Sequence, residues 1–337
     1  MSAQQHQNRH RTRLASARAA GDREAAVEAL HEIALARMVQ GDFSGALGLA
    51  EEALREASGA ASGIRARARY VLGRIQLNRG QSAAARDHLD VSADVFAALG
   101  DHSQAGEATQ QLAQALIAEK QMDAADEALR RAARHFADAG QQDRVIGVLR
   151  HRALVLSGMG RSKQSLAVLS EAVRLAGRLE DDAARMQLNL DMLAFSGHNA
   201  QPPAGTSHDE LFIEAMQKGE WAIAGHAALG RAGNLAQRGD LKGAITDAIA
   251  ARRLALRSVD VVGYLGACLM LAVLYERDAE PVEVVTVLLT CQETMGRRFG
   301  PEARLPALLY LDSLAMRWGT ERFEAVIRTY RSQFPEE

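Results

Sequence analysis

Cysteine, proline and aromatic residues are scarce in this chain, and each scarcity excludes a class of fold. Two of the 337 residues are cysteine, too few for a disulfide scaffold, and Cys268 and Cys291 are expected to be small buried residues in a reducing compartment. No proline precedes residue 202, and aromatic residues make up 4% of the sequence. Because Ala, Leu, Arg, Glu and Gln fill the segments between turns, the sequence predicts an all-α chain.

A strong charge of one sign and a membrane-spanning apolar run are also missing. The formal net charge is −2, so no global attraction to nucleic acid or to an anionic membrane is expected. The apolar, uncharged stretch 261–275 is fifteen residues long, whereas a helix needs about twenty to span a bilayer. The N-terminus has no apolar segment typical of a secretory signal. These features favour a soluble cytoplasmic protein that neither binds nucleic acid nor inserts into membranes.

A turn signal recurs about every twenty residues through the chain. Most of these turns centre on glycine, as at Gly80 and Gly160. Four are read without glycine, at Lys120-Gln121, Glu180-Asp181, Ser258 to Asp260 and Asp278 to Pro281. Alternate turns from Gly41 to Gly319 are 39 to 41 residues apart, apart from one double interval of 79. A fixed period of this size indicates stacked helix pairs, and the short turns require each pair to be antiparallel.

Several helix boundaries carry the expected capping residues. Asp22, Asp101 and Ser162 are predicted N-caps, and Ser207 with Glu210 forms a predicted capping box. In addition, Pro281 and Pro301 suit the first turn of a helix.

The pattern within the helix pairs resembles the tetratricopeptide repeat in its longer, roughly forty-residue variety. In the second unit, Leu72-Gly73 precedes Gly80 at the spacing of that family. Small residues recur after the turns, at Ala46, Ala85, Ala125 and Ala244. The resemblance covers residues 22 to 334 and implies a right-handed α-solenoid of about eight antiparallel helix pairs. The chain departs from the family pattern in its few large aromatics, in the missing repeat-ending prolines of the first five units, and at Glu283 and Glu324.

The repeats divide the chain into four predicted segments. Residues 1–21 form a basic, partly helical extension, and 22–196 form the N-terminal repeats. Residues 197–207 are an irregular loop, interpreted either as a flexible junction or as a functional loop. Residues 208–337 form more apolar repeats with a capping helix, and their apolar excess belongs either to an ordinary core or to a homodimer interface.

No pattern of catalytic or ligand-binding residues is apparent. Glycines occur singly at turns and build no phosphate-binding loop. The ten histidines are scattered, and His6 and His10, four residues apart, are better explained by a polar tail than by a metal site. The sequence therefore predicts no catalytic residue, cofactor or metal, and a non-enzymatic protein.

In the tetratricopeptide family the first helix of each pair lines a concave groove. The resemblance places seven candidate partner-binding residues there: Arg67, Tyr70, Arg74, Asn78, Gln110, Gln114 and Arg150. Arginine binds carboxylates in bidentate fashion, whereas Tyr and Asn bond to a peptide backbone, so an acidic or extended protein segment suits them. The alternative is a solvated helix face with one half-exposed Tyr.

Three functions follow as hypotheses. The first is a non-catalytic adaptor or scaffold that binds a partner protein or peptide in the groove. The second is a bacterial regulator whose superhelix changes shape when it binds a peptide or another signal. The third is an enzyme subunit with its active site in the 197–207 loop.

Overall fold

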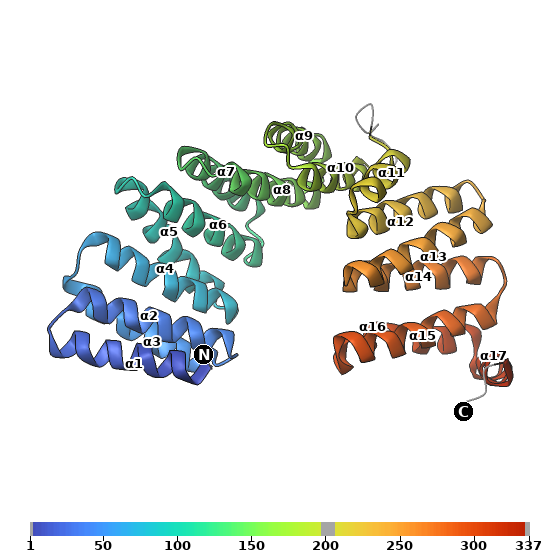
Figure 1. Ribbon diagram of the computed structural model, residues 1–337, viewed down its shortest axis with the longest axis horizontal. Helices are drawn as coiled ribbons and strands as arrows, with labels where there is room; N and C mark the ends of the chain where they lie inside the picture. The colour runs from blue at the N-terminus through green and yellow to red at the C-terminus, as the bar shows by residue number, and fades with distance from the viewer. Residues whose placement is uncertain (1–2, 197–205, 334–337) are drawn as a thin grey trace. The chain divides into compact units, whose positions relative to one another are not determined.

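The computed structural model describes residues 3–196 and 206–333, with side chains from residue 9 onward. This part of the chain consists of α-helices and two short 3-10 helices, and it contains no strand (Figure 1). One helix, α1, precedes eight successive pairs, which confirms the predicted all-α solenoid of helix pairs. The helices are α1 (Ala3–Ala19), α2 (Arg23–Val39), α3 (Phe43–Glu56), α4 (Ser62–Asn78), α5 (Ser82–Ala98), α6 (His102–Ala118), α7 (Met122–Asp138), α8 (Gln142–Gly158), α9 (Ser162–Arg178), α10 (Asp182–Ser196), α11 (His208–Lys218), α12 (Trp221–Gln237), α13 (Leu241–Ser258), α14 (Val261–Arg277), α15 (Pro281–Phe299), α16 (Leu305–Trp318) and α17 (Thr320–Gln333), with the 3-10 helices η1 (Ala57–Gly59) and η2 (Pro301–Arg304).

Residues with positive φ end most of the helices. Glycine occupies most of these positions, for example Gly80 with φ of 76° and Gly160 with φ of 74°. The four turns predicted without glycine are of the same kind, because φ is 61° at Lys120, 55° at Glu180, 57° at Val259 and 59° at Ala279. A residue without a Cβ adopts this conformation at the lowest cost, which explains the glycine-rich repeat of the sequence.

Most of the predicted caps are present. Asp22 accepts a hydrogen bond from the amide of Ala25 at 3.0 Å, and Asp101 accepts one from Gln104 at 3.1 Å. The Ser207–Glu210 capping box forms, and Pro281 is the first residue of α15. Pro301 is also the first residue of a helix, although that helix is the short 3-10 helix η2. One prediction was wrong: Arg161 directly follows the turn glycine and becomes the N-cap, which leaves Ser162 inside α9.

Small side chains let the two helices of a pair approach closely. Ala46, Ala85, Ala125 and Ala244, the small residues predicted after the turns, are all fully buried. A Cβ added at Gly73 would lie 2.8 Å from Cγ of Leu89, so this glycine is needed where α4 packs against α5.

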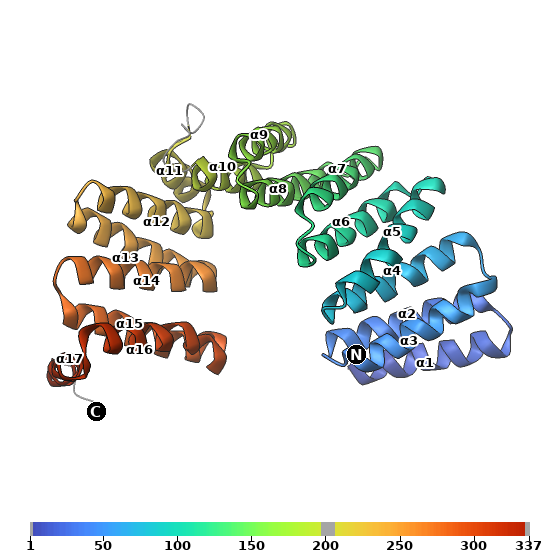
Figure 2. The same ribbon diagram turned by 180° about the vertical axis from the view of Figure 1, so that it is seen from behind.

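The chain forms two compact units, which are described separately. Unit 1 comprises Met1–Asp181 with helices α1 to α9, and unit 2 comprises Asp182–Glu337 with helices α10 to α17 (Figures 1 and 2). α10 belongs to unit 2 because Met186 and Leu190 pack with Leu211 and Ile223 in one apolar cluster. Most of the predicted loop, residues 197–205, lies outside the described residues, and the four-segment division stays a prediction.

The core of unit 2 contains both cysteines. Cys268 on α14 and Cys291 on α15 are fully buried free thiols, as expected, and they pack with Tyr264 and Leu271. Burial raises the pKa of Tyr264 to about 12, which keeps its phenol protonated. Within the described residues, no helix combines the length and the apolar character that crossing a membrane requires.

Candidate functional site

The first helices of the pairs in unit 1 carry residues at equivalent positions. α2 contacts α4, and α4 contacts α6. Because the helices repeat with a period of 39 or 40 residues, residues at the same distance from each helix start form rows across α2, α4, α6 and α8. We call these rows the first-helix face. They comprise His31, Tyr70, Gln110 and Arg150; Leu35, Arg74, Gln114 and Leu154; and Glu28, Arg67, Glu107 and Gly147.

Tyr70 connects two of these helices. Its side chain is buried, with 8% of its surface exposed, rather than half-exposed as expected for a solvated face. Its hydroxyl donates a hydrogen bond to Glu107 Oε2 on α6 at 3.3 Å. The guanidinium of Arg74 lies 5.4 Å from the centre of the Tyr70 ring, within the range of a cation–π contact. Burial raises the pKa of Tyr70, so it remains a hydrogen-bond donor.

Glu107 belongs to this face but was not predicted from the sequence. Its carboxylate accepts a hydrogen bond from Arg144 Nη2 on α8 at 2.7 Å, in addition to the bond from Tyr70. The guanidinium of Arg144 also lies 5.0 Å from the ring centre of Phe136. Glu107 therefore joins α4, α6 and α8 through one side chain. The repeat itself contained the signal, because Glu107 lies forty residues after the predicted site residue Arg67.

Arg67 lies beside two residues of α2. Its guanidinium is 4.0 Å from Glu28, longer than a hydrogen bond, and its side chain is 46% exposed. Glu28 forms a closer ion pair with Arg13, at 2.7 Å. His31 is buried, and neither of its ring nitrogens has a hydrogen-bond partner. Burial, and then the charge of Arg67, lower the pKa of His31 to about 4, so its imidazole is neutral at physiological pH.

The remaining predicted site residues differ in their surroundings. Asn78 is exposed at the end of α4, where its amide nitrogen donates to the Arg74 carbonyl at 2.8 Å. Gln110 and Gln114 are half-buried on α6, and Arg150 is exposed on α8. The structure thus groups all seven residues on three neighbouring first helices. Their role in binding a partner stays a prediction.

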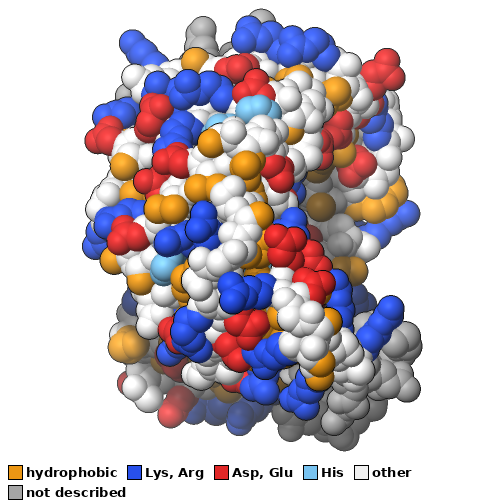
Figure 3. Space-filling view, turned by 90° about the vertical axis from the view of Figure 1, so that its left-hand side faces the viewer, with side chains coloured by type: hydrophobic (Ala, Val, Ile, Leu, Met, Phe, Trp, Pro, Cys, Tyr) orange, Lys and Arg blue, Asp and Glu red, His pale blue; other side chains and the backbone are white. Residues whose placement is uncertain are grey.

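Basic and acidic side chains are mixed on the surface of unit 1. On the face drawn in Figure 3, basic and acidic side chains are interspersed, and large areas of one sign are not visible. Arg131 of α7, for example, pairs with Asp94 of α5 at 2.8 Å and lies 3.5 Å from Asp90. Mixed charges of this kind favour selective contacts with a partner over a general attraction to polyanions.

Two cavities of unit 1 lie away from the predicted residues. One, of about 380 Å³, is lined by residues of α1, α2 and α3, among them Arg18, Arg23 and Glu56. The other, of about 260 Å³, lies between α5 and α7, with Leu112 and Leu116 of α6 in its lining. The first-helix face is therefore better described as an array of side chains than as part of either cavity.

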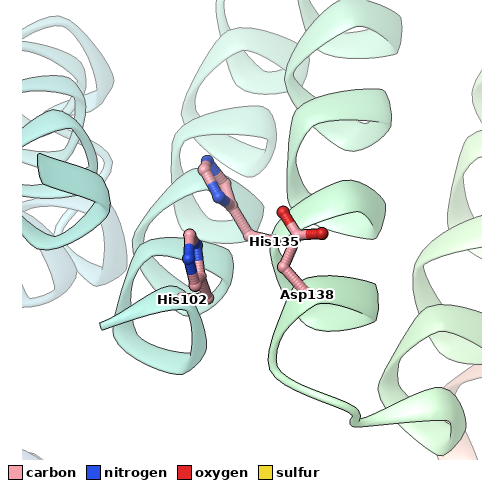
Figure 4. A group of neighbouring side chains, drawn as sticks. All are labelled: His102, His135 and Asp138. Carbon is pink, nitrogen blue, oxygen red and sulfur yellow. The ribbon is translucent and has the colours of Figure 1, made fainter. Parts of the chain in front are cut away.

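A second group of residues that the sequence analysis missed lies at one end of α6 and α7. His102, His135 and Asp138 come together there, although the histidines had been read as scattered (Figure 4). The pKa of His135 is lowered by burial, and then by the charges of Arg131 and His102. Antiparallel pairing of the two helices produces this cluster from positions that are distant in sequence.

Comparison with known proteins identifies the fold. No protein-family model matches the chain, and no curated protein matches it. Among solved structures, the apo form of the quorum sensor NprR from B. thuringiensis has a TM-score of 0.52 at 12% identity, covering 90% of this chain and 85% of that one. NprR in complex with its cognate peptide NprX has a TM-score of 0.50 at 12% identity, covering 92% of this chain and 90% of that one. A putative kinesin light chain from Podospora anserina with nearly identical TPR-like repeats has a TM-score of 0.48 at 18% identity, covering 57% of this chain and 93% of that one. The chain therefore has the α-solenoid fold of the tetratricopeptide-like repeat proteins.

Proposed function

We propose that this protein is a non-catalytic adaptor or scaffold that binds an extended segment of a partner protein on the first-helix face of unit 1. The observation that carries the proposal is the network around Glu107, which holds Tyr70 and Arg144 in place across three first helices. Side chains fixed in this way lose little further entropy when a ligand binds.

The chemistry of the same face favours an acidic partner segment. Arg67 is 46% exposed and has no closer carboxylate than Glu28 among its described ion pairs, at 4.0 Å. Arg74 is half-buried above Tyr70, and the amides of Gln110 and Gln114 follow on α6. Guanidinium groups bind carboxylates, and side-chain amides pair with the N–H and C=O groups of an extended backbone. A cytoplasmic location belongs to the same proposal and is supported by the two free thiols, Cys268 and Cys291.

Site-specific photo-crosslinking tests this assignment. A photo-reactive residue in place of Gln114, on α6, is expected to capture a defined partner from the native cell. The same residue in place of Arg130, on α7, serves as the control, because that side chain is 49% exposed but lies on a second helix. Equal capture at both positions, or capture at Arg130 alone, would place the binding surface elsewhere.

The alternative proposal is a peptide-responsive regulator. It is supported by the likeness to NprR, described as a quorum sensor and solved with its cognate peptide NprX, although a shared fold at 12% identity does not carry function by itself. In this case peptide binding would change the shape of the solenoid. Small-angle scattering with and without a peptide that binds the first-helix face distinguishes the two. A changed profile favours the regulator, and an unchanged one favours the scaffold.

A homodimer formed through the C-terminal repeats is a further part of the proposal. It is supported by α16, on which Leu305, Leu309 and Met316 are 58%, 59% and 80% exposed. Apolar side chains that gather on one helix and remain in water are a common feature of subunit interfaces.

A further inference from the structure

The histidines at the end of the α6–α7 hairpin are placed by the antiparallel packing of these two helices. His102 is the first residue of α6, His135 lies in the last turn of α7, and Asp138 is the last residue of α7. The spacing of three residues places His135 and Asp138 on one side of α7, and His102 faces them from α6 (Figure 4).

The donor atoms of these residues are close enough to share one ion. One nitrogen from each imidazole and one carboxylate oxygen of Asp138 all lie within 4.8 Å of one another. The two rings are stacked, with their centres 6.0 Å apart and their planes 23° from parallel. A tetrahedral zinc site with bonds of about 2.0 Å separates its ligand atoms by about 3.3 Å, so modest side-chain rotations would complete the geometry.

Two buried nitrogens in this group have no hydrogen-bond partner. They are Nδ1 of His102 and Nδ1 of His135. A buried ring nitrogen without a partner is unfavourable, and a metal ion bound to that nitrogen in its unprotonated form would satisfy it.

The surrounding charges do not prevent cation binding. Arg131 and Arg134 are the basic residues near His135, and both act on its pKa. Arg131 is paired with Asp94 at 2.8 Å, and Arg134 with Glu127 at 3.3 Å. These acidic partners offset much of the positive charge around the site.

We propose that His102, His135 and Asp138 bind one divalent transition-metal ion of the zinc class at the end of the α6–α7 hairpin. Two imidazoles and a carboxylate are ligands that suit Zn²⁺, whereas Mg²⁺ and Ca²⁺ prefer sites built from oxygen alone. Three protein ligands leave a fourth position for water or for a donor atom of another molecule. The ion would also link the start of α6 to the end of α7.

Titration of the full chain with Zn²⁺ and with Co²⁺ tests the proposal. His6 and His10 are replaced by Gln in every sample, because residues four apart on a helix can also bind a metal. One equivalent of Zn²⁺ is expected to bind by calorimetry, Co²⁺ should give the visible absorption of a tetrahedral complex, and Mg²⁺ should give no binding. Zinc should also raise the melting temperature.

The variants that decide the question are His102→Gln, His135→Gln and Asp138→Asn. Each is expected to weaken zinc binding at least tenfold and to remove the zinc-dependent rise in melting temperature. The matched control is His151→Gln, on the neighbouring helix α8, where the histidine is also half-buried; it should bind zinc as the parent chain does. Asp138 is exposed, so Asp138→Asn should fold normally even if a histidine variant does not. Zinc binding that is absent in the parent chain, or unchanged in His135→Gln and Asp138→Asn, would overturn the proposal.

Discussion

The hydroxyl of Tyr70 on α4 donates a hydrogen bond to the carboxylate of Glu107 on α6 at 3.3 Å. The same carboxylate accepts a 2.7 Å bond from Arg144 on α8. One acidic side chain therefore satisfies donors from both neighbouring first helices.

Replacement of Glu107 by Ala should destabilise the protein. The change removes the acceptor of the Tyr70 hydroxyl and the ion-pair partner of Arg144, at a cost of about 1 kcal/mol in the free energy of unfolding. Urea denaturation measures this cost. Glu127→Ala is the control. Glu127 pairs with Arg130 and Arg134 on its own helix, and its side chain is 49% exposed. Removing this side chain should lower the free energy of unfolding by less than about 0.5 kcal/mol. Equal losses in the two variants would mean that the Glu107 network contributes no more than a surface ion pair.

His31 should make stability depend on pH. Its pKa is about 4 in the folded protein, against 6.5 as the ordinary value, so the unfolded chain binds a proton more readily between these pH values. Stability is therefore fully present above about pH 6.5 and declines as the pH falls toward 4, by about 3 kcal/mol in total.

The variant His31→Leu should lose this part of the pH dependence. Denaturation at pH 7 and at pH 4.5 measures it. Ile33→Val, a buried change on the same helix that involves no titratable group, should lower stability by a similar amount at both pH values. A pH dependence in His31→Leu equal to that of the parent chain would show that the buried imidazole is not its source.

Replacement of Val259 by glycine should stabilise the protein. It has φ of 57° at the end of α13 and is 68% exposed, so its side chain is strained and contributes little packing. Val259→Gly is expected to raise the free energy of unfolding by about 0.5 to 1 kcal/mol, because relief of the left-handed strain exceeds the entropy cost of glycine. Val273→Gly, an exposed change within α14, should instead lower it. Thermal unfolding measures both effects. A Val259→Gly variant less stable than the parent chain, like Val273→Gly, would contradict the argument.

The exposed apolar residues of α16 should hold two copies of the chain together. Analytical ultracentrifugation is expected to show a dimer for the parent chain. The double change Leu309→Glu and Met316→Glu should weaken dimerisation at least tenfold, because it would bury carboxylates in an apolar interface. Leu154→Glu, at a 56% exposed position on α8, should leave the dimer intact. A parent chain that sediments as a monomer would rule out this interface.

The fold could be predicted from the sequence because each turn depends on local chemistry. Even Lys120 and Glu180, which are not glycine, have positive φ at the positions that the period requires. The N-cap of α9 is Arg161, one residue before the predicted Ser162, because a turn signal does not fix the exact residue at which the next helix begins.

The contacts between helices were harder to predict. Tyr70 and Arg74 were placed on one helix face by the resemblance to the tetratricopeptide family, whereas Glu107 was missed because its partners lie on two other helices. His102 and His135 are 33 residues apart and come together through the antiparallel packing of α6 and α7. A periodic sequence indicates which helices are neighbours, but it does not indicate which side chains meet between them.

The central claim is tested most directly by measuring how tightly two arginine variants bind a purified partner segment. This segment is the one captured through position 114. Arg74→Ala removes a guanidinium from the first-helix face, and Arg174→Ala removes an exposed one from the second helix α9. Isothermal titration calorimetry should show a loss of about 1 to 3 kcal/mol for Arg74→Ala and no measurable change for Arg174→Ala. Unchanged affinity in Arg74→Ala, or an equal loss in both variants, would contradict binding on the first-helix face.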